Sequence, residues 1–280
     1  MSPRADAGFA PLPDGGRLAY SRLGQQHAGL PVLLNRPLGG SMSLWGYFAG
    51  ELSRLHPVVM FDPRGVGRSS DVPLLHSTRA MAADALALLD YLQIERAHVF
   101  GLSLGGMVAS WLAMDAPART GSLILASTLP GPEAVSWRTV RRLLTFSNCL
   151  SKGQVAFEVC LVHQVLSPAF IAAHPERVRA IERDVRAMPS TRRNLFLLMS
   201  MALRHSTEQR LFRISSPTLL LFGGNDELAG RAARVDLATH LPNAVLAVMP
   251  NAGHDLSLEQ PMELAGRVSG FLDSRISIGL

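Results

Sequence analysis

The stretch Ala97-His98-Val99-Phe100-Gly101-Leu102-Ser103-Leu104-Gly105 decides how this chain folds. Its first four residues form an apolar run with the length of a short buried strand, and Gly101 to Gly105 reads G-x-S-x-G. Between a strand and a helix, this pattern is typical of a nucleophile elbow, a turn so sharp that its serine adopts a strained backbone conformation. Flanking glycines let the strand and the helix approach each other. We therefore predict that Ser103 is a nucleophile; a glycine-rich turn without chemistry is the alternative.

A serine hydroxyl needs a base, and the base needs a carboxylate that fixes its orientation. Two later strand candidates each lead into a loop that carries one of these groups. Thr218 to Phe222 is followed by Asp226, and Ala244 to Val248 is followed by His254. The order serine, acid, histidine is the one expected after such an elbow. We predict that His254 is the general base and then acid, and that Asp226 fixes its tautomer.

Other carboxylates lie next to these two residues. Glu227 and Asp255 directly follow Asp226 and His254 in the sequence. They are weaker candidates, because a sequence neighbour of a histidine rarely reaches the Nδ1 side of the same imidazole. Asp226 also has a simpler interpretation as a turn residue, since Asx side chains after glycines bond their own backbone.

Three further segments carry a family resemblance. Val32 to Ser41 resembles an oxyanion loop, and Phe61 to Ser69 resembles the turn D-x-R-G-x-G-x-S. Gly253-His254 followed by Glu259-Gln260-Pro261 resembles a catalytic-histidine loop. Together with the elbow, these motifs resemble the α/β-hydrolase family. The wording of the elbow and the oxyanion loop is similar to that of 3-oxoadipate enol-lactonases and their esterase and lactonase relatives.

This resemblance covers the chain from about Leu18 to Leu272 and implies an α/β-hydrolase fold. We expect a mostly parallel sheet of the eight-stranded type, flanked by helices, with an inserted all-helical cap. The expected core domain is 1–130 and 215–280, and the expected cap is 131–214. Over the cap the strand pattern stops and helical segments follow. The resemblance places the cap over Ser103, where it would supply most of the substrate pocket.

The alternation of apolar runs and helical periods agrees with this fold. Arg17 to Arg22 is expected as an antiparallel edge strand, and the short apolar runs after it suit a buried parallel sheet. Those runs are 32–35, 57–61, 97–100, 122–126, 218–222 and 244–248. The expected helices are 43–55, 78–92 and 104–115 in the core, and 138–144, 154–165, 175–188 and 191–204 in the cap.

The oxyanion loop departs from the family pattern at one point. The family usually carries His-Gly before the oxyanion residue, whereas this chain has Arg36-Pro37. Pro37 has no amide hydrogen to donate. We therefore predict that the backbone N–H groups of Leu38 and Leu104 form the oxyanion hole. If Pro37 occupied the donor position instead, the hole would be half built.

The expected cap is strongly basic. It holds thirteen Arg and Lys against six Asp and Glu, although the net charge of the whole chain is only +5. The simplest interpretation is a solvated helical face. Two sharper ones are an anionic substrate held by arginines and a docked acidic carrier protein. Arg36, expected near the pocket mouth, and Trp137 are the candidate substrate-binding residues. Nucleic acid is not expected, because the arginines show no aromatic interleaving.

Bulk properties exclude several classes. Residues 1–10 hold no apolar signal region, and no apolar run approaches 18 residues, so we expect neither secretion nor a membrane span. Cys149 and Cys160 are the only cysteines, which favours free thiols in a reducing cytoplasm and no metal site. No glycine-rich phosphate loop follows the first strand, so no cofactor is expected.

The predicted activity is that of a serine hydrolase. It would cleave a carboxylic ester or a lactone through an acyl-enzyme, with the Ser103–His254–Asp226 triad. Three alternatives remain open at this stage. A cofactor-free perhydrolase and a C–C bond hydrolase use the same triad. A small-molecule receptor of this fold keeps the triad but hardly turns over.

Overall fold

Short apolar runs form the strands of a central sheet in the computed structural model, which describes residues 6–131, 154–187 and 190–276 of the chain. The eight strands follow the spatial order β1-β2-β4-β3-β5-β6-β7-β8. Their bounds are β1 Asp6–Pro11, β2 Arg17–Leu23, β3 Val32–Asn35, β4 Val58–Phe61, β5 Ala97–Leu102, β6 Thr120–Ala126, β7 Thr218–Gly223 and β8 Ala244–Met249. The first two pairings, β1 with β2 and β2 with β4, are antiparallel, and the remaining ones are parallel.

The strand predictions are confirmed within a few residues, with two corrections. The segment predicted as an edge strand is β2, which lies between β1 and β4 rather than at the edge. The strand at that edge, β1, is absent from the sequence-based set, whereas β8 at the other edge was predicted. The sequence of β1, DAGFAP, is mostly exposed and ends in proline, so it has no apolar run. By contrast, β3, β4, β5 and β7 are buried at every residue, as strands covered on both faces must be.

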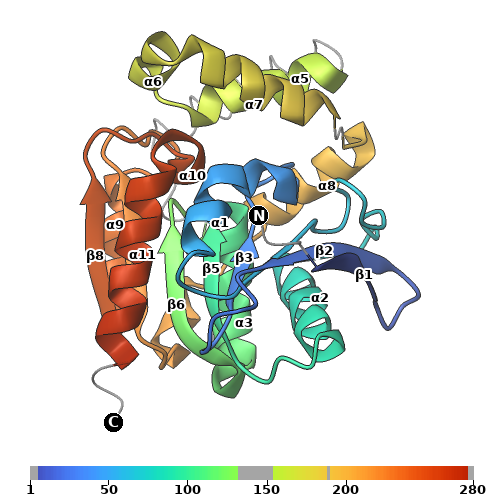
Figure 1. Cartoon of the computed structure of the whole chain (residues 1–280), viewed down its shortest axis with the longest axis vertical. Coiled ribbons are helices and arrows are strands. Elements are labelled where there is room, and N and C mark those ends of the chain that lie inside the picture. The colour runs from blue at the N-terminus through green and yellow to red at the C-terminus, as the bar shows by residue number, and fades with distance from the viewer. Residues whose placement is uncertain (1–5, 132–153, 188–189, 277–280) are drawn as a thin grey trace.

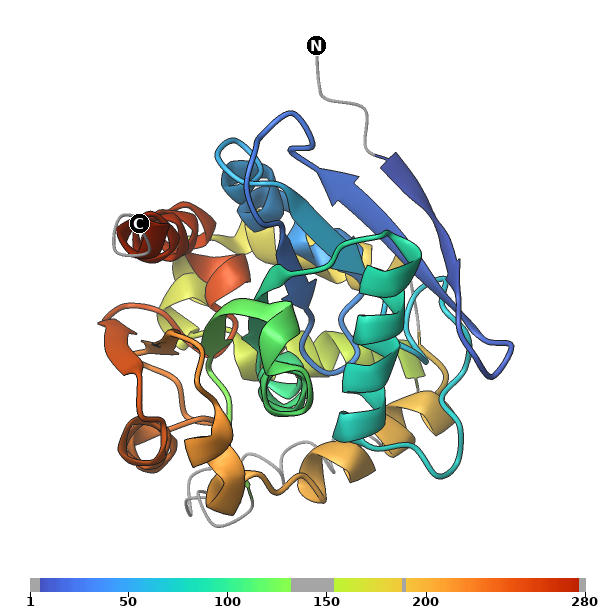
Figure 2. The same cartoon turned by 90° about the horizontal axis from the view of Figure 1, so that it is seen from below.

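Helices cover both faces of the sheet (Figures 1 and 2). On one face, α1 packs against α11, and on the other α2 packs against α3. The core helices and 3-10 turns are η1 Met42–Trp45, α1 Gly46–Leu52, α2 Thr78–Tyr91, α3 Leu104–Asp115, η2 Pro117–Arg119, η4 Glu208–Arg213, α9 Arg231–His240, α10 Leu256–Glu259 and α11 Pro261–Ile276. The helix predicted over 43–55 is thus a 3-10 turn followed by a shorter α-helix.

Alternation along the strands divides the core between these two faces. In β3, Leu33 belongs to the cluster under α2 and α3, while Val32 and Leu34 belong to the cluster under α1 and α11. At the centre of the second cluster, the rings of Trp45 and Phe48 lie 5.6 and 5.1 Å from that of Phe100 in β5. These contacts fix the strand that leads into Ser103.

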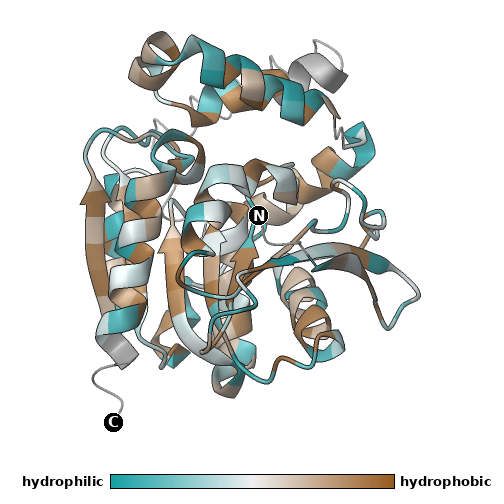
Figure 3. Ribbon diagram, in the orientation of Figure 1, coloured by the Kyte–Doolittle hydropathy of each residue, from teal (hydrophilic) through white to brown (hydrophobic). Residues whose placement is uncertain are grey.

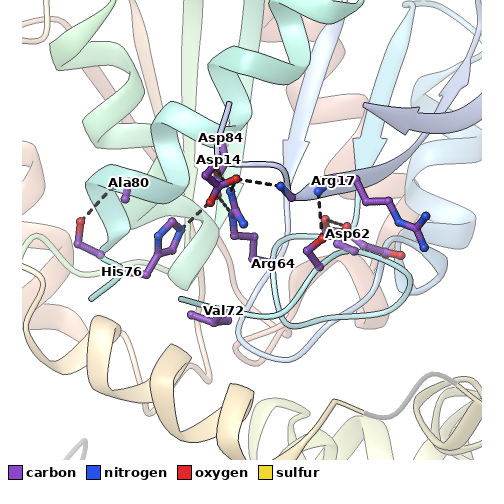
Figure 4. A network of polar contacts seen from close by, with 12 residues as sticks. Asp14, Arg17, Asp62, Arg64, Val72, His76, Ala80 and Asp84 are labelled. Atoms are coloured by element: carbon purple, nitrogen blue, oxygen red, sulfur yellow. Dashed lines mark hydrogen bonds and ion pairs between the residues drawn. The ribbon is translucent and has the colours of Figure 1, made fainter. Parts of the chain in front are cut away.

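The D-x-R-G turn after β4 is held by two buried polar groups (Figure 4). Asp62 accepts hydrogen bonds from the backbone N–H of Met42 at 2.7 Å and of Arg68 at 3.0 Å. Arg64 pairs with Asp84 at 2.8 Å and with Asp14 at 2.7 Å. Because Met42 begins η1, Asp62 also fixes the segment that follows the oxyanion loop.

Between β6 and β7, the described residues form helices and turns but no strand. The cap helices, as we call them, are α5 Gln154–Val165, α6 Pro168–Ala173, α7 Pro175–Ala187 and α8 Arg192–Leu203. Helices α5 to α7 lie beyond the end of the sheet (Figure 1), and α7 is largely hydrophilic (Figure 3). The α7 residues Val178 and Ile181 pack with Leu44 and Leu258 of the core in a small cluster of their own.

The boundaries of a separate cap domain stay a prediction. Helix α8 places Leu198 and Met201 in the main core cluster, and η4 adds Leu211. The insertion therefore shares its apolar packing with the core at its C-terminal end. The helix expected over 138–144, like Trp137, lies outside the described residues.

Two expectations about the whole chain can be compared with the structure. Within the described residues, no helix combines the length and the apolar character that a membrane span requires. The prediction of free thiols is wrong for Cys160, which is disulfide-bonded in the structure. Cys149 lies outside the described residues.

Candidate active site

Ser103 occupies the turn between β5 and α3 with a backbone φ of 55° and ψ of −118°. This is the strained conformation that the elbow motif predicts. The neighbouring glycines are required by close approach. A Cβ on Gly101 would lie 2.2 Å from the carbonyl oxygen of Gly105, and one on Gly105 would lie 2.0 Å from that of Asn35. Backbone atoms cannot yield to such contacts, so neither position accepts a larger residue.

The end of β6 supports the strained residue from the other side. The Ser103 N–H donates to the carbonyl oxygen of Ala126 at 2.9 Å, and the Ser103 carbonyl accepts from Thr128 Oγ1 at 2.7 Å. Ser127, between these two residues, also has a positive φ, of 45°. Both hydrogen bonds involve the main chain of Ser103. Its hydroxyl takes part in neither of them.

The structure brings the three predicted triad residues together. His254 Nε2 lies 2.9 Å from Ser103 Oγ. On its other side, His254 Nδ1 lies 3.0 Å from each carboxylate oxygen of Asp226. Asp226 follows β7 and also accepts the backbone N–H groups of Leu228 and Ala229, each at 2.9 Å. Since a carboxylate only accepts, the arrangement places the imidazole proton on Nδ1 and leaves Nε2 to accept from the serine.

The charges of this buried pair support each other. Burial acts against a charged imidazole, but the Asp226 carboxylate outweighs it and raises the pKa of His254 above its ordinary value. Burial likewise acts against the Asp226 carboxylate, yet the facing imidazole and two backbone N–H groups lower the pKa of Asp226. Asp226 therefore stays ionised over the pH range in which His254 gains or loses its proton.

The predicted oxyanion donors flank the serine. The cavity that Ser103 and His254 line is also lined by Pro37, Leu38 and Leu104. Leu104 is the first residue of α3, and an N–H in the first turn has no acceptor within its own helix. The oxyanion loop turns after Leu38 through Gly39, at φ 72°. The roles of the Leu38 and Leu104 amides stay predictions.

The predicted placement of Arg36 at the pocket mouth is wrong. Its side chain is 2% exposed, and its guanidinium pairs with Asp255 at 3.2 Å and donates to Ser257 Oγ at 3.2 Å. It also stacks over the ring of Trp45, 4.4 Å from the centroid. Arg36 does not line the cavity. The guanidinium is neutralised inside the protein, and it ties the oxyanion loop to the loop of His254.

The cavity over Ser103 has a volume of about 170 Å³ and an apolar lining. Within the described part of the chain, no charged side chain lines it unless His254 is protonated. Core and cap both contribute; the described lining residues are Pro37, Leu38, Ser103, Leu104, Met107, Ser127, Thr128, Leu129, Gly131, Leu161, Val165, Met199, Ala202, Leu203, Leu228 and His254. The cap residues among them were not identified from the sequence, because helical periodicity alone does not tell which apolar face meets a cavity.

Among the described residues, one group has the composition of a metal site. Ligand atoms of Glu208, Asp236 and His240 lie within 4.8 Å of one another, at partly and fully exposed positions. None of the three lines the cavity. His240 is already paired with Asp236 at 2.8 Å. The group has no connection to the triad, and the expected absence of a metal stays a prediction.

Comparisons with known proteins show which family and fold the chain shares. A family model described as serine aminopeptidase, S33, matches residues 47–261. The protein named "Putative carbamate hydrolase RutD" of Pseudomonas savastanoi pv. phaseolicola is 32% identical over 254 residues, which cover 89% of this chain and 96% of the relative. The 3-oxoadipate enol-lactonase 2 of Acinetobacter baylyi is 30% identical, with 87% and 88% covered. The crystal structure of a hydrolase from Pseudomonas aeruginosa PA01 has a TM-score of 0.83 at 27% identity, with 95% and 98% covered.

The buried pair of Arg36 and Asp255 makes a stability prediction. Replacing Arg36 by Met leaves the carboxylate of Asp255 buried without its cation, which costs roughly 3 kcal/mol of unfolding free energy. The double variant Arg36→Met/Asp255→Asn removes that charge and recovers most of the loss. Urea denaturation at pH 7 measures both. A single variant as stable as the wild type would contradict the pairing.

Proposed function

This chain belongs to the serine aminopeptidase S33 family of α/β hydrolases, and from that premise we propose that it cleaves a neutral carboxylic ester or lactone through an acyl-enzyme. One observation carries the proposal: Ser103 Oγ, the imidazole of His254 and the carboxylate of Asp226 form an unbroken chain of contacts of 2.9 and 3.0 Å. Ser103 and His254 line a cavity large enough for a small organic molecule.

The proposed reaction follows from the roles that this geometry allows. Ser103 Oγ attacks the carbonyl carbon while His254 Nε2 takes its proton. The carbonyl oxygen becomes an oxyanion, held by the N–H groups of Leu38 and Leu104. His254 then protonates the leaving oxygen, the C–O bond breaks, and the acyl group stays on Ser103. Water, deprotonated by His254, releases the acid and restores the serine.

The cavity favours a neutral, apolar substrate over an anionic one. A carboxylate that entered it would lose its hydration and would meet no cation on the described lining. Arg36, which the sequence also offered as a residue that could hold a substrate carboxylate, is paired with Asp255 instead. We therefore narrow the substrate to an ester or lactone with an uncharged acyl part.

The names of the relatives suggest two substrate classes for the same chemistry. One is named a carbamate hydrolase, and another an enol-lactonase. In both classes a serine can attack the carbonyl, so the triad does not discriminate between them. The apolar lining around Ser103 supports a lactone or an alkyl ester more than a small, strongly hydrated carbamate.

An acidic carrier protein and a cytoplasmic location stay predictions. Arg183, Arg186 and Arg192 of the cap helices are exposed, which suits either a solvated face or a docking face. Residue 137 and the basic residues of 138–152 lie outside the described residues.

Replacing Ser103 by Ala tests the nucleophile. We expect kcat/KM for a p-nitrophenyl ester to fall by about a thousandfold or more, because the acyl-enzyme can no longer form. Ser110→Ala is the matched control, since its hydroxyl donates to the carbonyl of Gly106 within α3 and lies outside the cavity. Steady turnover beyond one equivalent in the wild type separates an enzyme from a receptor. Activity retained by the Ser103 variant would refute the assignment.

The Asp226–His254 pair predicts the pH dependence. His254 acts as a base only when neutral, and its pKa is raised, so kcat/KM should increase with pH through an apparent pKa above 6.5. In Asp226→Asn, burial still opposes the imidazolium but its counter-charge is gone. We expect the pKa of His254 to fall and the rate to drop about a thousandfold or more. NMR titration of the imidazole measures the shift directly; a pKa unchanged or raised by the substitution would contradict the pairing.

Substrate charge is tested with two esters of matched shape. The acyl chain of p-nitrophenyl pentanoate ends in a methyl group, whereas that of p-nitrophenyl hemiglutarate ends in a carboxylate. We expect kcat/KM to be at least about tenfold higher for the pentanoate, since the carboxylate must leave water for an apolar cavity. A preference for the hemiglutarate would show instead that a cation outside the described residues reaches the substrate.

A further inference from the structure

The loop that carries His254 is held by the cap as well as by the core. We call residues 253–259 the His254 loop. The backbone N–H groups of His254 and Asp255 both donate to the carbonyl oxygen of Val165, each at 3.0 Å. Val165 is the last residue of α5 and also lines the cavity. The backbone of the proposed catalytic base is therefore hydrogen-bonded to a cap helix.

Glu259 makes the second connection between these segments. Its carboxylate is buried and accepts the backbone N–H of Ser167 at 2.6 Å, the Ser167 hydroxyl at 2.8 Å and the backbone N–H of Gly253 at 3.0 Å. Ser167 lies in the turn between α5 and α6, and Gly253 directly precedes His254. One side chain thus bridges the cap to the residue beside the base.

The packing around this bridge leaves little freedom. A Cβ on Gly253 would lie 2.4 Å from Glu259 Oε1 and 2.8 Å from the Ser167 nitrogen. Ser167 in turn caps α6, where its hydroxyl accepts the N–H of Phe170 at 3.2 Å. Arg177 of α7 donates to the carbonyl oxygen of Leu258 at 2.8 Å. These contacts seat the cap on the His254 loop itself.

We propose that Glu259 is a positioning residue that couples the seating of the cap to the placement of His254. When the α5–α6 turn is seated, Glu259 and Val165 hold the main chain on both sides of the imidazole. When the turn lifts to admit substrate, the Val165 carbonyl leaves with it and Glu259 loses its bonds to Ser167, so that only the bond from Gly253 remains and Nε2 loses its fixed distance to Ser103. Closure of the cavity and assembly of the triad then become one event. This inference rests on the proposed function.

The coupling predicts a specific kinetic signature. A residue that serves only stability would change the unfolding free energy and leave kcat intact. A residue that serves only substrate binding would raise KM. A residue that positions the base lowers kcat with little change in KM, because small displacements of a reacting group are costly in rate.

The test uses Glu259→Gln with two matched controls. A glutamine keeps one acceptor oxygen but turns the other into a donor, so either Ser167 N–H or Gly253 N–H loses its acceptor. Glu263→Gln makes the same change at an exposed residue of α11 that pairs with Arg267. Ser167→Ala is the second variant, and its control is Thr191→Ala, which removes an equivalent N-cap from α8 without touching the His254 loop.

We expect Glu259→Gln to lower kcat for p-nitrophenyl pentanoate roughly tenfold or more, with KM within about twofold. Ser167→Ala should lower kcat less, because the Ser167 N–H still donates to Glu259. Amide hydrogen exchange of 254–258 should accelerate in both variants, while both controls behave as the wild type. If Glu259→Gln does not fold, Ser167→Ala decides.

One result would overturn the proposal: a folded Glu259→Gln protein with wild-type kcat, whether or not its KM is raised. The Ser103→Ala variant keeps this failure distinct from a failure of the proposed function. An inactive Ser103 variant beside a fully active Glu259 variant removes only the coupling, whereas an active Ser103 variant removes the proposed function first.

Discussion

The backbone of Ser103 is the constraint on which the rest of the site depends. A non-glycine residue at φ 55° costs about 1–3 kcal/mol and persists only where its surroundings fix it. Here Gly101 and Gly105 permit the close approach, and Thr128, two residues after the end of β6, fixes the serine carbonyl. The strained turn points the hydroxyl toward the loops after β7 and β8, where Asp226 and His254 lie. The sheet order, which brings β5, β6, β7 and β8 side by side, makes that meeting possible.

Much of this arrangement could be predicted from the sequence, because each triad residue follows a short apolar run bounded by turn residues, which favours a strand. Thr218 to Phe222 forms the buried strand β7, and Ala244 to Val248 forms β8, which lies at an edge of the sheet and is partly exposed although its run is apolar. β1, at the other edge, could not be found this way, since its sequence has no apolar run. The residues of α5 and α8 that line the cavity also could not be predicted from the sequence, because the lining depends on how helices far apart in sequence pack together.

Arg36 shows where local sequence misleads. A cation beside an oxyanion loop suggests a substrate carboxylate, yet its partner is Asp255, 219 positions away in the chain. Nothing in the local sequence signals that pairing. Its consequence is structural: the ion pair connects the oxyanion loop to the His254 loop, while Glu259 connects the same loop to the cap. His254 is thus held between the proposed oxyanion loop and the cap helix whose last residue, Val165, lines the cavity.

The two supports differ in a way that assigns them different tasks. The Arg36–Asp255 pair lies between two core segments, and separating buried opposite charges is costly, so it suits a contact that never opens. Glu259 has no cation among its hydrogen-bond partners in the described structure. Besides the Gly253 N–H of its own loop, it accepts two hydrogen bonds from Ser167 of the cap, which water can replace when the cap lifts. In the proposed coupling, a permanent ion pair on the core side and an exchangeable set of hydrogen bonds on the cap side let His254 keep one anchor while the cap opens and closes.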